Sequence, residues 1–473
     1  MQFNFTDQEL LIAKSISKIS AKLNFTSFFV GGIVRDRILE RPSKDIDVVC
    51  VGDGIKLAQA VGEELGIKQQ VVVFKRFGTA MLKFRDVELE FVGARKESYT
   101  HDSRKPDVEP GTLTDDQNRR DFTINAMAVS LNEGSFGAII DPFNGIEDIK
   151  KKCIRTPLDP SKTFSDDPLR MMRGIRFASQ LNFTIDFVTF KGIQDNAYRL
   201  EIISQERITQ ELNKIILSKT PSLGFNLMSK AGLLNIFFEE FEQLRGVDVI
   251  NGQGHKDNYY HTLKVLDNLC EDTDDLWLRW AAILHDIAKP PTKRFTEDHG
   301  WTFHGHEVVG ARMVPKIFKR FKLPLDHKMK FVQKLVRLHL RPISLTNNDI
   351  TDSAMRRLLF DAGEDLDDLM MLCKADITSK NEAKVARIKA NYEQVKIKLK
   401  EVEEKDQIRY WQPPISGDLI MQTFNIPPSR VVGEIKDAIR EAILDGDIAN
   451  DYDSAYNFML EKAKDLGFEL PAS

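Results

Sequence analysis

The chain has 473 residues, too many for one hydrophobic core, so we expect two to four domains. Its apolar content of 42% is typical of a soluble protein, its net charge is −4, and no apolar run approaches the roughly 20 residues that cross a bilayer. These features argue against a membrane protein and against a nucleic-acid binder that is basic throughout.

The first 27 residues predict an amphipathic helix, with apolar residues at roughly helical spacing at Leu10, Leu11, Ile16 and Ile19. This end of the chain has no basic segment followed by an apolar core, so we expect no signal peptide. Residues 28–140 alternate between strand and helix patterns. We predict strands over 28–30, 45–51, 70–74, 79–84, 87–93 and 136–140.

The most informative stretch is FFVGGIVRDRILERPSKDIDVVC, which begins at Phe28. Glycines at Gly31 and Gly32 let the backbone approach a ligand and free its N–H groups, and a short helix then starts near Val34. On the following strand, Asp45 and Asp47 share one face because side chains alternate. Two carboxylates on one face repel each other unless a cation lies between them. Mg²⁺ is the usual cation when phosphates are the substrate.

Taken separately, Gly-Gly indicates a turn and Asp-x-Asp a solvated strand edge. Their ordered combination resembles the nucleotidyltransferase superfamily, in particular the class II tRNA nucleotidyltransferase and poly(A) polymerase family. The resemblance implies that Asp45 and Asp47 hold Mg²⁺ at a catalytic centre. It also implies nucleotide contacts from Gly31, Gly32 and Arg35.

A third carboxylate is expected from the alternating strand VELEFVGAR, where Glu88 and Glu90 share a face. A polar strand edge is the alternative. The family has a carboxylate at the position of Glu90, so we favour Glu90 as the third catalytic carboxylate.

The stretch RRDFTINA is similar to the second motif of the family. The resemblance implies that Arg120 meets the triphosphate and that Asp121 and Asn125 lie near the sugar. The stretch DPFNG matches a third motif, a hinge, with Asn144 where the family usually has glycine. Asparagine tolerates the left-handed backbone, so this departure is mild.

A helix is predicted to open at DDPLRMMRGIRF, with Pro168 in its first turn. Asp167 and Arg170 are three apart and would share a helix face. Arginine only donates and an ionised aspartate only accepts, so the pair could accept the pairing edges of C and A and reject U and G. The family uses this device here; the alternative is a surface ion pair. We assign Arg173 and Arg176 to nucleotide binding as well.

Basic residues cluster although the net charge is negative. The clusters are Arg119-Arg120, Lys150 to Lys152, Arg170/Arg173/Arg176 and Lys316/Lys319/Arg320/Lys322. The alternative for each is a solvated helix face. The helix ERITQELNKII resembles the fifth family motif, and we expect Glu206 and Arg207 to brace neighbouring helices without doing chemistry.

Six of the nine histidines lie between residues 255 and 306. A helical His, then His-Asp after an apolar helix, then a distant Asp resembles the pattern of HD phosphohydrolases. Imidazoles and carboxylates on facing helices suit a divalent metal that activates water. The predicted ligands of this second metal site are His261, His285, Asp286 and Asp376, with His306 and His339 as further ligands. For any single histidine, a satisfied core or surface residue is the alternative.

We therefore predict an α+β fold in which a head with a mixed sheet precedes helical parts. The expected parts are a nucleotidyltransferase head (1–147), a helical neck for base recognition and tRNA binding (148–245), an HD domain (246–405) and a helical tail (406–473). The four cysteines are far apart and show no Cys-x-x-Cys spacing, which indicates thiols in a reducing cytoplasm.

The predicted activity is addition of CCA to the 3′ end of tRNA from CTP and ATP, without a nucleic-acid template. We expect Mg²⁺ as cofactor, tRNA as partner and no membrane association. The sequence does not specify an oligomeric state. CC-adding, A-adding and poly(A)-adding enzymes share the same motifs and remain alternatives. An HD phosphohydrolase with a non-catalytic head is an alternative from another class.

Overall fold

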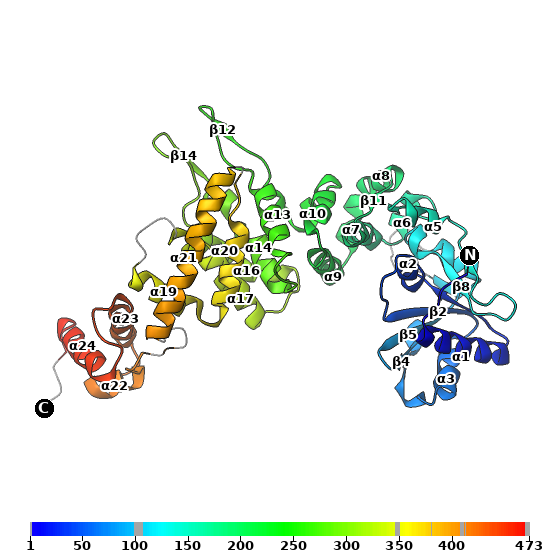
Figure 1. Ribbon diagram of the computed structural model, residues 1–473, viewed down its shortest axis with the longest axis horizontal. Helices are drawn as coiled ribbons and strands as arrows, with labels where there is room; N and C mark the ends of the chain where they lie inside the picture. The colour runs from blue at the N-terminus through cyan, green and yellow to red at the C-terminus, as the bar shows by residue number, and fades with distance from the viewer. Residues whose placement is uncertain are drawn as a thin grey trace. The chain divides into compact units, whose positions relative to one another are not determined.

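The computed structural model describes residues 2–98, 107–345, 351–379, 381–406, 411 and 413–468. It divides into two compact units, Met1–Glu242 and Gln243–Ser473, and each is described by itself (Figure 1). The sheet lies in the first unit and helices dominate the remainder, which confirms the α+β prediction. The finer division into four parts stays a prediction.

A mixed sheet forms the centre of the first unit. In the described residues it has seven strands in the order β3-β4-β5-β2-β1-β8-β9, and β2 runs parallel to β5. The strands are β1 (Thr26–Val30), β2 (Asp45–Val51), β3 (Val71–Phe74), β4 (Thr79–Phe84), β5 (Val87–Gly93), β8 (Ala128–Ser130) and β9 (Ile139–Ile140).

The register of β2 and β5 brings acidic side chains together. Asp47 lies opposite Glu90. The residues that alternate with them, Ile46 and Leu89, are buried. Because neighbours along a strand point to opposite faces, the sheet has one apolar face in the core and one acidic face.

Helices α1 (Asp7–Leu23) and α3 (Gly54–Glu64) pack on each other and on the sheet. Ile16 and Ile19 of α1 are buried as predicted. Leu11 is 44% exposed, so its assignment to the apolar face was wrong. The apolar stripe passes through Ile12 instead, which is one position further along the helix.

The strands over 45–51, 79–84 and 87–93 have the predicted bounds. The predicted strand 136–140 shrinks to β9, because Gly137 adopts a φ of +80° in the preceding turn. Strand β8 was missed because it lies in a continuous buried run, whose period does not separate strand from helix. The hairpin of β6 (Arg95–Ser98) and β7 (Asp107–Pro110) was also missed.

The other helices of the first unit lie between or after the strands of the sheet, and a parallel pair of two-residue strands lies in the region expected to be helical. The elements are α2 (Gly32–Ile38), α4 (Leu113–Asn118), α5 (Gly145–Lys150), β10 (Cys153–Ile154), α6 (Pro160–Asp166), α7 (Leu169–Leu181), β11 (Thr184–Ile185), α8 (Phe187–Asn196), α9 (Gln205–Ile216), α10 (Pro221–Lys230), α11 (Leu233–Phe237) and α12 (Glu239–Glu242). Asn144 precedes α5 in the left-handed conformation that its sequence position suggested (φ 59°).

In its described residues, the second unit is helical apart from two small hairpins. Its elements are β12 (Val249–Ile250), β13 (Gln253–Gly254), α13 (Asn258–Leu269), α14 (Leu276–Leu284), α15 (Lys289–Thr292), β14 (Arg294–Thr296), β15 (Gly300–Thr302), α16 (His306–Arg320), α17 (His327–Leu338), α18 (Leu340–Ser344), α19 (Asp352–Ala362), α20 (Leu366–Asp376), α21 (Glu382–Asp406), α22 (Gly417–Phe424), α23 (Arg430–Asp445) and α24 (Tyr452–Asp465). The predicted break after residue 406 falls partly outside the described residues. No described helix combines the length and apolar character that crossing a bilayer requires.

Candidate active site and candidate metal centre

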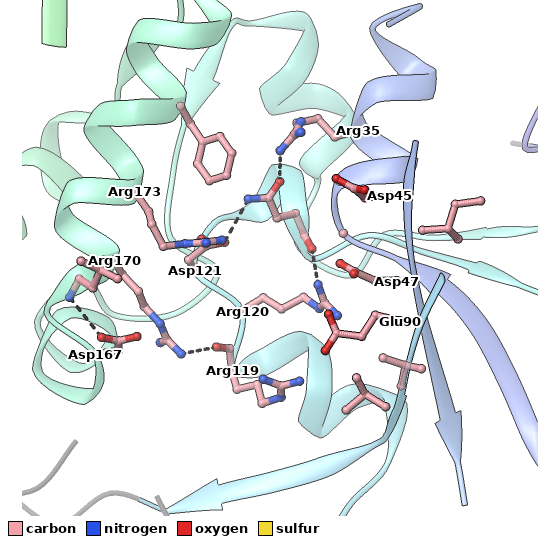
Figure 2. Close-up of a pocket in the computed structure, with 18 of the residues that line it drawn as sticks. Arg35, Asp45, Asp47, Glu90, Arg119, Arg120, Asp121, Asp167, Arg170 and Arg173 are labelled. Carbon is pink, nitrogen blue, oxygen red and sulfur yellow. Dashed lines mark hydrogen bonds and ion pairs between the residues drawn. The ribbon is translucent and has the colours of Figure 1, made fainter. Parts of the chain in front are cut away.

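One cleft of about 840 Å³ in the first unit gathers all the residues predicted for catalysis and nucleotide binding (Figure 2). They come from the start of helix α2, from β2 and β5, from the segment after α4, from the residue between α6 and α7, and from α7. The predicted residues that line it are Gly31, Gly32, Arg35, Asp45, Asp47, Glu90, Arg120, Asp121, Asn125, Asp167, Arg170, Arg173 and Arg176. Segments more than 100 residues apart in the sequence therefore meet at one place, although the role of each residue stays a prediction.

Three carboxylates face this cleft from the acidic side of the sheet (Figure 2). Burial raises the pKa of Asp47, and the nearby charge of Asp45 raises it further, against the opposing effect of Arg120. Burial and the charge of Asp47 likewise raise the pKa of Glu90. Negative charge at these positions is therefore costly without a cation, which is the property expected of a divalent-metal site.

The carboxylates of Asp45, Asp47 and Glu90 are less tightly gathered than the ligands of a closed metal site. Among the described residues, sets of three ligand atoms within 4.8 Å of one another occur only in the second unit. The donor set fits Mg²⁺, which prefers a few carboxylates together with water and substrate phosphates.

Gly31 permits the close approach of an arginine to the acidic strand. Its φ is +74°, and a Cβ there would lie 2.9 Å from Nη1 of Arg120 and 3.2 Å from Oδ2 of Asp47. Its N–H donates to the carbonyl of Met127 (3.3 Å). The expectation that this N–H would be free for a ligand was therefore wrong, and the glycine serves close packing instead.

A buried aspartate holds two arginines at the edge of the cleft. Asp116 is fully buried, and it accepts a hydrogen bond from Nε of Arg120 (2.9 Å) and another from Arg119. Burial acts to raise the pKa of Asp116, but the charges of Arg120 and Arg119 outweigh it and lower the pKa. Sequence reasoning missed Asp116, although its spacing of three and four residues from the arginines was visible.

A chain of hydrogen bonds joins α2, the segment after α4, and α7. Arg173 donates to Oδ2 of Asp121 (2.6 Å), and Asn125 donates to Oδ1 of the same carboxylate (3.1 Å). Arg35 in turn donates to Oδ1 of Asn125 (2.7 Å). Asp121 and Asn125, expected near the sugar, thus orient two arginines of the cleft through the protein's own hydrogen bonds.

Because Asp121 pairs with Arg173, we expect the free energy of unfolding to fall in acid. Burial alone would raise the pKa of Asp121, but Arg173 and Asn125 overcome it and hold the pKa at about 2. A carboxyl whose folded pKa lies below its unfolded value stabilises the protein above that unfolded value. We expect about 2 kcal/mol of unfolding free energy to disappear between about pH 4 and pH 2.

The measurement is urea unfolding of the wild type and of Asp121→Asn across this range. The variant should be less stable than the wild type at pH 7, and the difference should shrink as the pH falls to 2. A difference that stays constant with pH would contradict the assignment. Asp453→Asn, at an exposed site in the first turn of α24, is the control.

The arrangement of Asp167 and Arg170 differs from the prediction. Asp167 lies before α7 in extended backbone (φ −138°), and its Oδ1 accepts from the N–H of Leu169 (3.2 Å). Arg170 donates to the carbonyls of Arg119 (2.7 Å) and Thr163 (3.4 Å). Neither a shared helix face nor an ion pair between the two is observed. Both side chains nevertheless line the cleft.

Two further contributors to the cleft were missed or misassigned. Arg207, expected only to brace helices, lines the cleft, and its Nη2 lies 3.5 Å from Oδ2 of Asp167. The ring of Phe177 lies under the guanidinium groups of Arg176, Arg35 and Arg173, at 4.2, 5.0 and 5.6 Å from its centroid. Such a concentration of arginine suits an anion as highly charged as a triphosphate.

In the second unit, all six residues predicted for the HD constellation come together. Nε2 of His261 lies 2.9 Å from Asp376, and Nε2 of His285 lies 3.2 Å from Asp286. Two sets of three have ligand atoms within 4.8 Å of one another, and both contain Asp286. The sets are His261, His285 and Asp286, and Asp286, His306 and His339.

The ring orientations prepare these histidines for a metal. Nδ1 of His285, His306 and His339 each lies 2.7 Å from the backbone carbonyl three residues earlier, which fixes Nδ1 as the donor. The three Nε2 atoms are buried and have no hydrogen-bond partner among the described residues. Burial lowers the pKa of His339 to about 4, which keeps it neutral at pH 7. Imidazoles whose Nε2 atoms lie beside a carboxylate fit a divalent transition metal.

Comparison with known proteins yields three matching family models. They are the Poly A polymerase head domain (residues 27–155), the probable RNA and SrmB- binding site of polymerase A (182–244) and the HD domain (258–381).

Among relatives, the chain is similar to the A-adding tRNA nucleotidyltransferase of Deinococcus radiodurans, at 31% identity over 72% of this chain and 77% of the relative. It is also similar to the CCA-adding enzyme of Ligilactobacillus salivarius, at 28% identity over 93% of each. The chain spans about half or less of the length of two other relatives. It covers 53% of the A-adding tRNA nucleotidyltransferase of Halalkalibacterium halodurans and 23% of that of Aquifex aeolicus.

Among solved structures, the Bacillus stearothermophilus CCA-adding enzyme in complex with CTP superimposes with a TM-score of 0.66 and 22% identity. The match covers 97% of this chain and 98% of that one. At this identity the likeness concerns the fold.

Proposed function

The chain belongs to the tRNA nucleotidyltransferase family, and we propose that it completes the 3′ end of tRNA by adding C, C and A from CTP and ATP without a nucleic-acid template. One observation supports this most directly. The acidic face of the sheet, the arginines and the Asp167/Arg170 pair all open into one cleft.

Asp45 and Asp47, supported by Glu90, are the residues that would hold Mg²⁺ in the cleft. Bound there, Mg²⁺ would lower the pKa of the tRNA 3′-hydroxyl and neutralise charge on the triphosphate. Arg120 and Arg173 would bind the triphosphate, since both are already oriented by buried carboxylates. Orientation in advance lowers the entropic cost of aligning the hydroxyl with the α-phosphate.

Asp167 and Arg170 would read the base of the incoming nucleotide. Each is held by the backbone around it and not by its counterpart, so acceptor and donor atoms remain for a base. Cytosine and adenine both present an amino donor beside a ring acceptor, whereas uracil and guanine present the reverse order. Arg207, close to Asp167, would restrict the position of that carboxylate.

The activity is tested with tRNA transcripts that end at the discriminator base, at C or at CC, each incubated with one nucleotide at a time. We expect CTP to be incorporated on the first two and ATP on the third. Incorporation of ATP only on the CC end would indicate an A-adding enzyme. Long products from ATP alone would indicate a poly(A) polymerase. Either result would overturn the proposal.

If Asp167 and Arg170 recognise the base of the nucleotide, replacing either residue should weaken base selection and leave the chemical step intact. Asp167→Ala or Arg170→Ala should reduce the preference for CTP and ATP over UTP and GTP by about 10- to 100-fold, the effect of one or two hydrogen bonds to a base edge. The measurement is kcat/KM for each of the four nucleotides. Asp195→Ala, which breaks an exposed pair with Lys191, should leave the preference unchanged.

A second activity is supported by the buried His/Asp centre of the second unit. We propose that His261, His285, Asp286, His306, His339 and Asp376 hold a divalent metal for hydrolysis of a phosphate ester. Bound there, the metal would supply an activated water, and the ring orientations described above leave the ligand atoms free to receive it.

A further inference from the structure

His261 differs from the other histidines of the His/Asp centre in what its ring contacts. On the other three, Nδ1 lies against a backbone carbonyl and Nε2 is the atom left for a metal. On His261, Nδ1 lies 2.8 Å from Nζ of Lys256 and 3.0 Å from Oγ1 of Thr378. The ring of His261 therefore contacts a lysine on the side where the other rings contact a carbonyl.

The contact with Lys256 decides which nitrogen of His261 carries the proton. An ammonium group has three donors and no acceptor, so Nδ1 accepts from it and carries no proton. In a neutral ring the proton then lies on Nε2, which is 2.9 Å from Oδ1 of Asp376 and can donate to it. A protonated Nε2 has no lone pair for a metal. In this arrangement His261 is blocked as a ligand, although its ring lies among the other ligands.

Thr378 supplies the partner that His261 needs in order to bind a metal. A hydroxyl group both donates and accepts. Oγ1 of Thr378 lies within 3.0 Å of Nδ1 of His261 and 2.7 Å from Nζ of Lys256. When the ammonium group leaves, Nδ1 can donate to this hydroxyl, and Nε2 becomes free as it is on the other three histidines. The position of one lysine therefore decides between two states of the same ring.

Lys256 is placed to exchange this contact for an anion. The residue as a whole is exposed in the segment before α13, whereas its amine reaches the centre. Burial lowers the pKa of Lys256 and the charge of Lys289 lowers it further, against the opposing effect of Asp376. Nζ of Lys289 itself lies 2.6 Å from Oδ2 of Asp286. Two ammonium groups that repel each other at one centre are both attracted by a phosphate group, which accepts several charge-assisted hydrogen bonds.

We propose that Lys256 blocks the first set of metal ligands (His261, His285 and Asp286) until the phosphate group of an ester draws its ammonium group away. The second set (Asp286, His306 and His339) does not contain His261, so it binds its metal without this step. Lys256 is then a positioning residue for His261 in the empty centre and a contact of the phosphate in the occupied one. This inference rests on the proposed hydrolysis of a phosphate ester.

The test is equilibrium dialysis of the full chain against Mn²⁺ after removal of bound metal with a chelator. Every sample carries Asp45→Asn and Asp47→Asn, so that the cleft of the first unit does not contribute. Without further change, the weaker of two Mn²⁺ ions should bind about 10- to 100-fold more tightly when inorganic phosphate is present, the effect of one hydrogen bond to a charged group. Lys256→Met should bind this ion as tightly without phosphate, and phosphate should tighten its binding by a smaller factor.

Two further variants separate this effect from a general change of charge. Lys264→Met removes the same charge from an exposed position of α13, the helix that carries His261, and should leave Mn²⁺ binding within about twofold. Thr378→Val removes the acceptor for Nδ1 and should weaken the same ion by about 10-fold or more, even with phosphate. Tightening by Lys264→Met equal to that by Lys256→Met would overturn the proposal.

The proton position on His261 gives a readout that a nearby charge alone would not move. Long-range proton–nitrogen NMR correlations of the histidine rings distinguish the two neutral forms, and His261→Gln assigns the signal. Without metal, we expect the proton of His261 on Nε2 in the wild type and on Nδ1 in Lys256→Met. A proton on Nδ1 in both would overturn the proposal.

Hydrolysis of p-nitrophenyl phosphate tests the second role of Lys256. With saturating Mn²⁺, Lys256→Met should raise KM by about 10-fold and change kcat less, because the phosphate loses a contact. An unchanged KM would contradict that role. If no form of the chain binds Mn²⁺, the proposed metal centre fails together with this inference. If the wild type and Lys256→Met bind Mn²⁺ equally tightly with and without phosphate, the centre stands and only the role of Lys256 fails.

Discussion

Asp47→Asn is expected to reduce kcat for nucleotide addition by at least about 10³-fold, which corresponds to about 4 kcal/mol of transition-state stabilisation. The variant removes one of the two carboxylates proposed to hold Mg²⁺ and leaves the arginines of the cleft in place. The KM for ATP should therefore change little. Single-turnover incorporation on a tRNA ending in CC, at several Mg²⁺ concentrations, measures the effect.

Stability gives a second readout that separates this role from a structural one. The pKa of Asp47 is raised by burial, so its ionised form is disfavoured in the folded chain. A neutral Asn removes that cost, and the melting temperature should stay the same or rise.

Glu88→Gln is the matched control on the same face, opposite Asp45 in the register. Glu88 also lines the cleft, but its side chain is exposed and approaches Lys83 (3.9 Å), so the variant should cost less than about fivefold. A large effect of Glu88→Gln with a small effect of Asp47→Asn would contradict the assignment.

Asp286→Asn is expected to have the other large effect, because Asp286 belongs to both sets of ligands in the second unit. We expect metal affinity to fall by at least about 100-fold. Loss of a residue that only hydrogen-bonds to a metal ligand typically costs about 10- to 100-fold, and loss of the ligand itself should cost more. Hydrolysis of p-nitrophenyl phosphate or 2′,3′-cyclic AMP should fall by at least about 10³-fold. Nucleotide addition should persist, since the residues that line the cleft all lie in the first unit.

Metal content after dialysis, measured by plasma mass spectrometry, checks this prediction without relying on activity. Two histidines in the same short segment provide matched variants. His306→Asn removes a buried ligand and should lower metal content, whereas His304→Asn changes an exposed residue and should not. Equal metal content in His306→Asn, Asp286→Asn and the wild type would rule out the proposed centre.

The positions of Asp45, Asp47 and the six HD residues could be predicted because local rules determine them. Strand alternation places the aspartates on one face, and a helix that buries an apolar side carries its histidines inward. The left-handed conformation at Asn144 followed from the same kind of local preference.

The remainder of the cleft depends on contacts between distant segments. Arg173 reaches Asp121 across 52 positions, and Arg207 approaches Asp167 across 40. Asp116 carries no motif, and its importance appears only with its complete burial beneath two arginines. Phe177 has the sequence pattern of a core residue and is indeed buried, yet its ring also supports three guanidinium groups. Such relations follow from the packing of the first unit and not from any window of sequence.

The parallel register of β2 and β5 also makes the candidate active site depend on correct strand pairing. A slip of one residue would turn Glu90 into the apolar core and expose Leu89 or Phe91 beside Asp47. Misregistered chains would thus be both unstable and inactive, and quality control that removes unstable chains would remove inactive ones too. Insertions in the β4–β5 turn should be tolerated only when they leave this pairing in place.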